Sequence, residues 1–270
     1  MSANKLKPGL IGIPETALLT LWSRAKFATG ANPLLDDPLA VDLTERIDYA
    51  FQSSFGRPIL DIAIRSQCFD EHIRRFLAKS PAGPVIALGE GLETQFWRVD
   101  NGKVCWYSVD LPEVIDLRRH LLPAHERNIL TVGSVLDAKW LEKVPTDAPV
   151  FITAAGLFMY LERKQVHTLL RQIVQRFARG QLVFDTVSRW FSRKTLKGFN
   201  PTGGYTYPPM PFGLALPDVP DFMAEIPQIQ SSQVVAIADS YSRPSTLFKR
   251  FLHIPWVKNY WSSGLVHAVW

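Results

Sequence analysis

The stretch from residue 84 to residue 110 constrains the fold of this 270-residue chain more than any other. A short apolar run, Val85 to Leu88, is followed by two glycines, Gly89 and Gly91. A second apolar run then ends on Asp110. This spacing predicts a strand, a tight glycine turn, a short helix and a second strand that ends on a carboxylate. That is the arrangement of a nucleoside-cofactor site in a doubly wound α/β fold.

The same residues indicate which cofactor the turn suits. Glycine lets the backbone approach a ligand closely, and Asp110 is placed to accept both hydroxyls of a ribose. Thr94 stands where the GxGxxG pattern of dinucleotide sites has its third glycine. The nearest cations that could bind a 2′-phosphate, Arg118 and Arg119, follow Asp110 by about two helical turns. These features favour S-adenosylmethionine, which has a ribose but no phosphate.

Composition predicts one large α/β domain. The chain is 47% hydrophobic and 20% charged, which supplies enough apolar residues for a full core. Two cysteines, Cys68 and Cys105, are too few for a disulfide framework or a zinc site, and we expect no metal. No apolar run approaches the ~20 residues of a membrane helix, and the start lacks a signal-peptide core, so we expect a cytoplasmic protein with no membrane partner.

The charged residues argue against a nucleic-acid partner. The 30 lysines and arginines give a net charge of +5, but they are spread along the chain. A nucleic-acid-binding protein usually concentrates its basic residues in one stripe or in a known module. We therefore expect at most weak affinity for anionic partners. A monomer and a homodimer both stay open.

Hydrophobic periodicity predicts helices first and an α/β alternation afterwards. Apolar residues recur at helical spacing over 15–27 and 59–77, and a further helix begins at Pro38. Later helices are expected over 112–122, over a short stretch near 139–143 and over 162–178, with Gly180 as the stop of the last. Later strands are expected over 129–132, 150–154, 181–187, 234–238 and 265–270.

The texture of the sequence changes after residue 190. Residues 191–220 contain six prolines and are predicted to be an aromatic, proline-rich insertion with no regular element. The expected parts of this single domain are a helical cap over 1–80, a cofactor-binding α/β core over 81–190, this insertion on the substrate side, and a C-terminal sheet edge over 221–270.

Five stretches of the chain are similar to one known family. They are SRAKFATGANPLLDDPLA (23–40), AIRSQCFDEHI (63–73), VIALGEGLETQFWRVD (85–100), YSVDLPEVIDLRRHLLP (107–123) and AAGLFMYLERKQVHTLL (154–170). Together they resemble the leucine carboxyl methyltransferase family, and within it the bacterial branch of polyketide O-methyltransferases of the tetracenomycin-pathway type. The resemblance implies an α/β class I S-adenosylmethionine-dependent methyltransferase fold, a Rossmann-like seven-stranded sheet whose last strand is antiparallel, with an N-terminal helical cap.

The resemblance also implies which residues bind S-adenosylmethionine, whose product is S-adenosylhomocysteine. Arg65 would bind the carboxylate of the donor, and Lys26, or Arg24 beside it, would be a second carboxylate contact from the cap. The other implied contacts are Gly89 and Gly91 under the methionine part, Asp110 on the ribose, and Leu136 and Asp137 against the adenine.

One position departs from the family pattern. Ala155 stands where the family usually has a glutamate that contacts the donor at the end of the fourth strand. The departure leaves two alternatives open, a rearranged donor site and a weakened activity. It is also the motivation for a third, a non-catalytic member that keeps the fold.

Four aromatic residues are candidates for an acceptor site. Trp190, Tyr205, Tyr207 and Phe212 would form an apolar slot for a planar or acyl substrate, or would only pack against the cap. Methyl transfer from a sulfonium is an in-line displacement that depends mainly on holding the acceptor oxygen close and aligned. A carboxylate acceptor needs no general base and a phenol would gain from one, but the sequence identifies no catalytic residue.

The function expected from these observations is an S-adenosylmethionine-dependent O-methyltransferase. It would act on a hydroxyl or carboxylate oxygen of a small molecule, either polyketide-like or another secondary metabolite. Alternatives are a carboxyl methyltransferase for a protein C-terminus, the non-catalytic member, and a nicotinamide-dependent oxidoreductase. The last is disfavoured by Thr94 and by the lack of a Tyr-x-x-x-Lys pair in a suitable helix.

Overall fold

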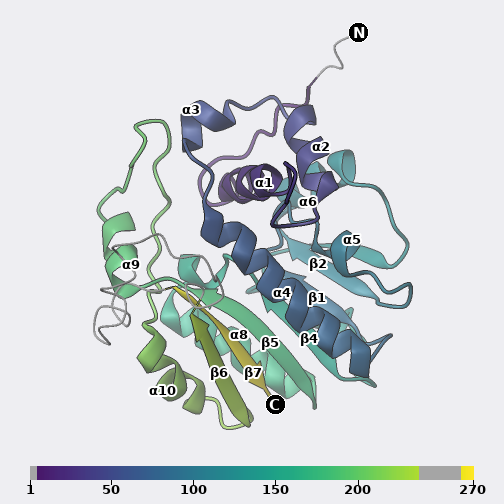
Figure 1. Ribbon diagram of the computed structural model, residues 1–270. Helices are drawn as coiled ribbons and strands as arrows, with labels where there is room; N and C mark the ends of the chain where they lie inside the picture. Colours follow the sequence, from purple (N-terminus) through teal and green to yellow (C-terminus); the bar gives the residue numbers. More distant parts are fainter. Residues whose placement is uncertain (1–4, 237–262) are drawn as a thin grey trace.

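The computed structural model of the protein describes residues 5–236 and 263–270 (Figure 1). These residues form one seven-stranded sheet with the order β3-β2-β1-β4-β5-β7-β6. The strands are β1 (Val85–Leu88), β2 (Trp106–Asp110), β3 (Asn128–Val132), β4 (Val150–Ala154), β5 (Gly180–Thr186), β6 (Ser231–Ala236) and β7 (Gly264–Val269). Strand β7 runs antiparallel to both β5 and β6, and the other neighbours are parallel. The expected sheet, with its last strand antiparallel, is confirmed.

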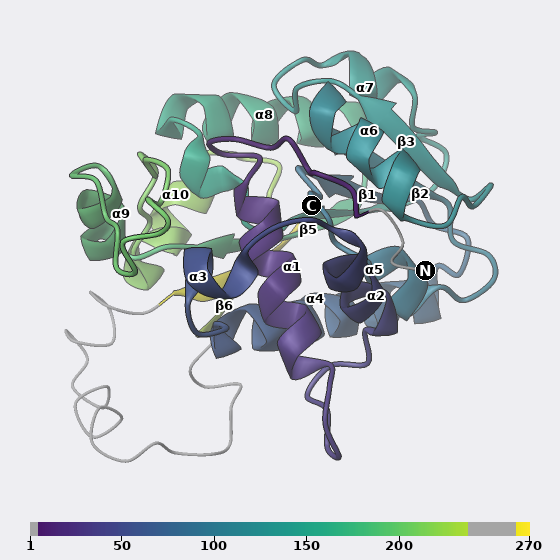
Figure 2. The same ribbon diagram turned by 90° about the horizontal axis from the view of Figure 1, so that it is seen from above.

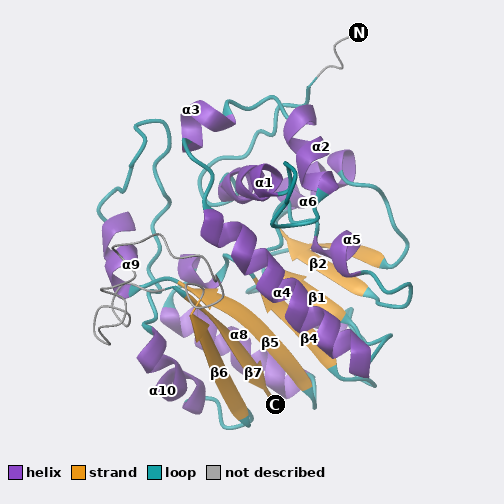
Figure 3. Cartoon of the chain, viewed as in Figure 1, coloured by secondary structure: helices purple, strands orange, loops and turns teal. Residues whose placement is uncertain are grey.

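Helices cover both faces of the sheet (Figures 2 and 3). The α-helices are α1 (Thr16–Phe27), α2 (Pro38–Arg46), α3 (Phe51–Phe55), α4 (Leu60–Lys79), α5 (Gln95–Val99), α6 (Pro112–Leu121), α7 (Lys139–Glu142), α8 (Arg163–Arg176), α9 (Arg189–Thr195) and α10 (Val219–Ala224). Two 3₁₀ turns cover Phe158–Tyr160 and Leu216–Asp218. Figure 2 shows α4 and α5 on one side of the sheet and α6, α7 and α8 on the other. No helix of the described ranges is long and apolar enough to cross a membrane.

Strand β1 shows why its sequence is apolar without interruption. Val85 and Ala87 pack in the cluster that includes residues of α4, whereas Ile86 and Leu88 pack in the cluster that includes residues of α8. Because alternate side chains of a strand point to opposite faces, a strand covered on both faces needs apolar residues at every position. The continuous apolar runs in the sequence are therefore buried parallel strands.

The sheet order creates a crevice at the carboxyl end of β1. This strand pairs with β2 on one side and β4 on the other, so the chain leaves the centre of the sheet in opposite directions. Ligands of open α/β sheets bind at such a switch point. Helices α1, α2 and α3 form a cluster with apolar residues of α6, and α1 lies over this edge of the sheet (Figure 1).

Two details of the predicted elements are wrong. The predicted insertion contains regular structure, since α9 covers its first residues and α10 its last. Helix α9 begins at Arg189 because the Ser188 hydroxyl accepts a hydrogen bond from the Phe191 backbone N–H, a standard N-cap. Gly180 does not stop a helix, because α8 ends at Arg176 and Gly180 begins β5.

The C-terminal strands lie close to their expected positions. Strand β6 begins three residues before the predicted Val234, and residues 237–238 of that prediction lie outside the described residues. Strand β7 matches the prediction to within one residue at each end. The division into cap, core, insertion and sheet edge stays a proposal, to which the structure adds that α4 packs on the sheet itself.

Position 180 has no room for a side chain, because the Trp270 ring packs against it. A Cβ at position 180 would overlap the indole ring, which is held by a hydrogen bond from its Nε1 to the Phe177 carbonyl. We expect Gly180→Ala to lower the free energy of unfolding by about 1–3 kcal/mol through overpacking, measured by urea denaturation. In a Trp270→Leu background the cost of Gly180→Ala should fall by more than half. An unchanged cost there would mean that the ring is not the cause.

Candidate active site

A cavity of about 720 Å³ lies at the carboxyl ends of the parallel strands and is also lined by residues of the N-terminal part of α1. Its lining includes the glycine turn, Asp110 and the ends of β4 and β5. Met159, Phe191, Tyr207 and Met210 also line it and pack together in one apolar cluster. Ile11, which is 82% exposed, lies at the rim. We call the part of the wall that contains the glycine turn, Asp110 and the ends of β4 and β5 the polar half of the cavity, and the part that contains this apolar cluster the apolar half.

The glycine turn has the conformation for which glycine is needed. Gly89 and Gly91 have φ angles of 58° and 60°, in the left-handed region. A Cβ on Gly89 would lie 2.7 Å from Leu157 Cδ1, and a Cβ on Gly91 would lie 3.0 Å from Ala17 Cβ. Both residues line the cavity. The turn thus requires glycine for its backbone angles and for its close approach to neighbouring groups.

Asp110 joins the end of β2 to this turn. Its carboxylate accepts hydrogen bonds from the Gly91 N–H at 2.7 Å and from the Leu111 N–H at 2.8 Å. Burial raises the pKa of Asp110 above its usual value, and these two hydrogen bonds act in the opposite direction. A carboxylate has about four acceptor sites, so the two bonds leave capacity for the hydroxyls of a ribose.

An ion pair lies on the wall of the polar half of the cavity. Arg65 on α4 donates from Nη1 to Asp185 Oδ2 at 2.6 Å, and the Gly156 N–H donates to Asp185 Oδ1 at 2.6 Å. Burial lowers the pKa of the Arg65 guanidinium, but the Asp185 carboxylate raises it, and the net change is upward. Both residues line the cavity. Their charges are therefore held side by side on its wall.

Asp185 was missed by the reasoning from sequence. It lies in β5 one residue before the end of the strand, the kind of position that identified Asp110 in β2. Ala155, expected at the place of a donor-binding glutamate, follows β4 and lines the cavity without offering a polar side chain. The acidic side chain at this end of β4 and β5 thus stands on β5.

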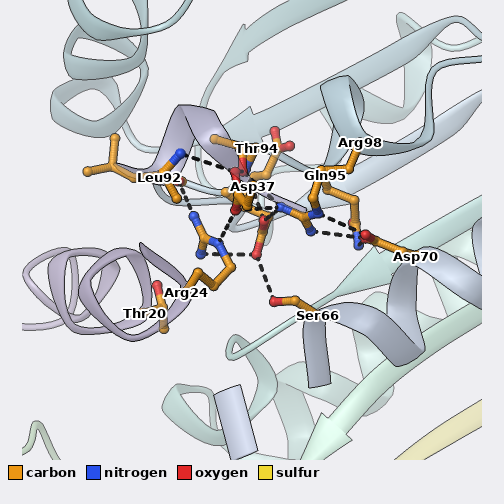
Figure 4. A network of polar contacts seen from close by, with 12 residues as sticks. Thr20, Arg24, Asp37, Ser66, Asp70, Leu92, Thr94, Gln95 and Arg98 are labelled. Atoms are coloured by element: carbon orange, nitrogen blue, oxygen red, sulfur yellow. Dashed lines mark hydrogen bonds and ion pairs between the residues drawn. The ribbon is translucent and has the colours of Figure 1, made fainter. Parts of the chain in front are cut away.

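A buried network of charges fixes the turn to the cap (Figure 4). Glu93 lies 3.1 Å from Arg24 Nη1 and accepts a hydrogen bond from Arg98 Nη1 at 2.6 Å. Asp37 pairs with the same two arginines at 3.1 Å and 3.0 Å. The Thr94 hydroxyl donates to Asp37 at 2.6 Å. The side chain at the position of the missing third glycine is therefore part of this network.

Three predicted donor contacts from the cap and the adenine end lie outside the cavity lining. Arg24 is buried and bonded to Asp37, Glu93 and the Leu92 carbonyl. The Lys26 ammonium lies 4.3 Å from the centre of the Trp22 ring. The exposed Asp137 carboxylate lies 3.6 Å from the Lys139 ammonium.

Leu136, the fourth such contact, is 36% exposed and is also absent from the described lining. The adjacent residues 133–135 line the cavity instead. They follow β3, the third strand to end at this edge of the sheet, which is the pattern that would have identified them.

Of the four predicted acceptor residues, one lines the cavity and three do not. Tyr207 lines the cavity. Tyr205 packs edge-on against Phe55, with ring centres 4.9 Å apart, and Phe212 packs against Phe222 in the core. The Lys194 ammonium lies over the Trp190 ring, which the described lining does not include. Tyr160 also lines the cavity, and burial strongly raises its pKa.

Comparison with known proteins identifies the family. A family model described as leucine carboxyl methyltransferase matches residues 17–174. The chain belongs to this family. The tetracenomycin polyketide synthesis O-methyltransferase TcmP of Streptomyces glaucescens is 34% identical over 187 residues, covering 68% of this chain and 69% of TcmP. The S-adenosyl-L-methionine-dependent methyltransferase dpfgK of Gibberella zeae is 35% identical over 214 residues, covering 68% and 70%.

Solved structures agree on the fold. The plantazolicin methyltransferase BpumL, in complex with a triazolic desmethylPZN analog and S-adenosylhomocysteine, matches with a TM-score of 0.51 at 10% identity, over 95% of this chain and 98% of BpumL. At that identity the likeness shows the fold alone. The fold confirms the expected class I methyltransferase architecture. The family membership and its relatives confirm that the protein is an S-adenosylmethionine-dependent methyltransferase, so the nicotinamide alternative is set aside.

The network around Glu93 makes stability depend on pH. Burial alone would raise the pKa of Glu93, but Arg24 and Arg98 lower it from 4.5 to about 2. A carboxyl group whose pKa is lower in the folded chain stabilises that chain above its unfolded pKa and loses the effect as pH falls toward the folded pKa. The difference corresponds to about 3 kcal/mol at neutral pH.

We expect wild type to be more stable than Glu93→Gln by about 3 kcal/mol at pH 7. This gap should shrink as pH falls from about 5 to about 2, as followed by urea denaturation at several pH values. The control is Glu71→Gln, whose side chain is 60% exposed in its pair with Arg75 and should change stability by less than about 0.5 kcal/mol. A gap that does not vary with pH would contradict this account.

Proposed function

We propose that this enzyme methylates a hydroxyl or carboxylate oxygen of a small molecule, a polyketide or another secondary metabolite, with S-adenosylmethionine as the donor. The observation that carries the proposal is a single cavity whose polar half contains the glycine turn and Asp110, and whose apolar half is rich in aromatic residues. The similarity to TcmP, an O-methyltransferase of tetracenomycin polyketide synthesis, supports the same class of acceptor.

The cavity wall suits the donor at each of its parts. In this proposal Gly89 and Gly91 lie under the methionine part and Asp110 binds the ribose. Residues 133–135, with Leu136 and Asp137 beyond them, are nearest to the adenine. Arg65 binds the carboxylate, since its Nε is buried and has no hydrogen-bond partner among the described residues. A guanidinium with a free edge matches a carboxylate.

The contribution of the chain to the reaction is alignment. When bound, S-adenosylmethionine supplies an electrophilic methyl group on a sulfonium. The aromatic and methionine side chains of the apolar half hold an acceptor close to the methyl group and exclude water. The two reacting groups are then already close and aligned when the reaction begins. An acceptor that is already a carboxylate needs no proton removed, whereas a hydroxyl acceptor must lose its proton. The proposal covers both oxygens.

Several expectations stay predictions. They are the cytoplasmic location, the monomeric or homodimeric state, the lack of nucleic-acid and membrane partners, and the independence from metal. Among the described residues no group of three histidine, cysteine or acidic side chains is arranged for a metal ion. The non-catalytic alternative and the protein C-terminus as acceptor are outcomes of the experiments below.

Donor binding is tested by calorimetry with S-adenosylmethionine, S-adenosylhomocysteine and NAD. We expect the first two to bind and NAD not to bind. Asp110→Asn should weaken both by about 10- to 100-fold, because a charge-assisted hydrogen bond to the ribose is lost. The control Asp116→Asn, which changes an exposed partner of Arg119 on α6, should bind as wild type does. Failure of wild type to bind either compound would favour the non-catalytic reading.

Acceptor binding is tested with a panel of aromatic carboxylic acids, phenols and a peptide that ends in leucine. With the best small acceptor, Tyr207→Ala should raise KM by about tenfold, through loss of a large apolar contact, and leave the Kd of S-adenosylhomocysteine unchanged. Trp190→Ala is the matched control, since Trp190 lies outside the described lining. An unchanged KM would remove Tyr207 from the acceptor site, and methylation of the peptide alone would favour the protein substrate.

A further inference from the structure

The Arg65–Asp185 pair keeps unused hydrogen-bonding capacity on both sides. Within the described residues only Nη1 of Arg65 has a partner, and the buried Nε has none. The two oxygens of Asp185 accept one hydrogen bond each, from Arg65 and from the Gly156 N–H. Since a carboxylate has about four acceptor sites, Asp185 can accept further bonds from a ligand.

A buried cation and a buried anion side by side match a zwitterion. The side chains of Arg65 and Asp185 are only 12% and 5% exposed, and both line the cavity. The α-amino-acid end of a ligand carries a carboxylate and an ammonium on one carbon, with the opposite order of charges. Pairing such an end with this ion pair satisfies the unused donors and acceptors on both sides.

We propose that Asp185 binds the α-ammonium group of the methionine part of S-adenosylmethionine, while Arg65 binds its carboxylate. This inference rests on the proposed donor site and adds to it the group that recognises the amine. It gives Asp185 a binding role that neither the glycine turn nor Ala155 supplies.

The other carboxylates of the lining are engaged elsewhere or exposed. Glu90 pairs with Arg118 at 2.9 Å and accepts a hydrogen bond from the Trp106 indole. Glu93 is held by two arginines, and Asp110 accepts hydrogen bonds from the Gly91 and Leu111 N–H groups. The remaining two, Asp61 and Glu113, are solvent-exposed. Asp185 is thus the buried carboxylate of the lining whose single arginine partner itself faces the cavity.

The register of the sheet explains the position of Asp185. Ala154 pairs with Phe184 across β4 and β5, so Ala155 and Asp185 are the next residues at the same edge. The side chain of Ala155 ends at Cβ, and the next residue, Gly156, offers its N–H to Asp185. A carboxylate on β5 therefore occupies the edge that β4 leaves without one.

The test uses three probes, namely S-adenosylhomocysteine, its analogue without the amino group and its analogue without the carboxylate. For wild type we expect the deaminated analogue to bind about 10- to 100-fold more weakly than S-adenosylhomocysteine. Asp185→Asn, which keeps an acceptor for the Gly156 N–H, should weaken S-adenosylhomocysteine by a similar factor. It should leave the Kd of the deaminated analogue within about twofold of wild type.

Arg65→Gln serves as the comparison variant, because its loss of affinity should depend on the carboxylate of the ligand and not on the amino group. It should weaken S-adenosylhomocysteine strongly and the decarboxylated analogue little. Thermal unfolding of each variant checks that the fold is retained. If Asp185→Asn lowers the affinity for S-adenosylhomocysteine and for the deaminated analogue by the same factor, Asp185 only positions Arg65. That result would overturn the proposal.

Wild type alone also decides the matter if Asp185→Asn does not fold. Binding of S-adenosylhomocysteine no tighter than that of the deaminated analogue would overturn the assignment of Asp185. Failure of wild type to bind S-adenosylhomocysteine at all would instead overturn the donor site proposed above, so the two failures are distinguishable.

Discussion

The buried carboxylate of Glu93 and the two arginines around it hold the glycine turn at the edge of the cavity in place. A buried charge that loses its partner destabilises a fold strongly, so each member of this group requires the others. Arg24 also donates to the Leu92 carbonyl, and Arg118 on α6 donates to the Gly91 and Glu93 carbonyls. The backbone of the glycine turn is therefore bound from two helices, and its shape depends on both being docked.

Thr94 shows how one substitution in a motif can have a structural cause. A third glycine at this position would leave Asp37 without the hydroxyl that donates to it at 2.6 Å. The backbone N–H of Thr94 also donates to the Glu93 carboxylate at 3.0 Å. Sequence reasoning took Thr94 as a sign against a dinucleotide, and the structure adds that the same residue joins the turn to the segment that precedes α2.

Features set by neighbouring residues could be predicted from the sequence, and features set by distant residues could not. The strand, the turn and Asp110 follow one another within 26 residues, so their pattern alone predicts them. Asp185 is different, because its role depends on its contact with Arg65, which lies 120 residues earlier in the chain. Gly180 likewise resembles a helix stop until the indole of Trp270 is placed against it.

The acceptor side illustrates the same limit. Tyr205 and Tyr207 are equally aromatic and two residues apart, but only Tyr207 lines the cavity, whereas Tyr205 packs against Phe55 of α3. No local pattern distinguishes them, because the difference arises from the contact of this loop with the cap.

The cavity wall carries more negative than positive charge, and this has a consequence for exchange of the cofactor. The acidic side chains of the described lining are Asp61, Glu90, Glu93, Asp110, Glu113 and Asp185, and its basic side chain is Arg65. Even with Arg24, Arg98 and Arg118, which pair with Glu93 and Glu90, acidic groups outnumber basic ones. A sulfonium is attracted by this excess, whereas the thioether left after transfer is neutral. With the donor bound in this cavity as proposed above, the wall favours replacement of the product by fresh donor between turnovers.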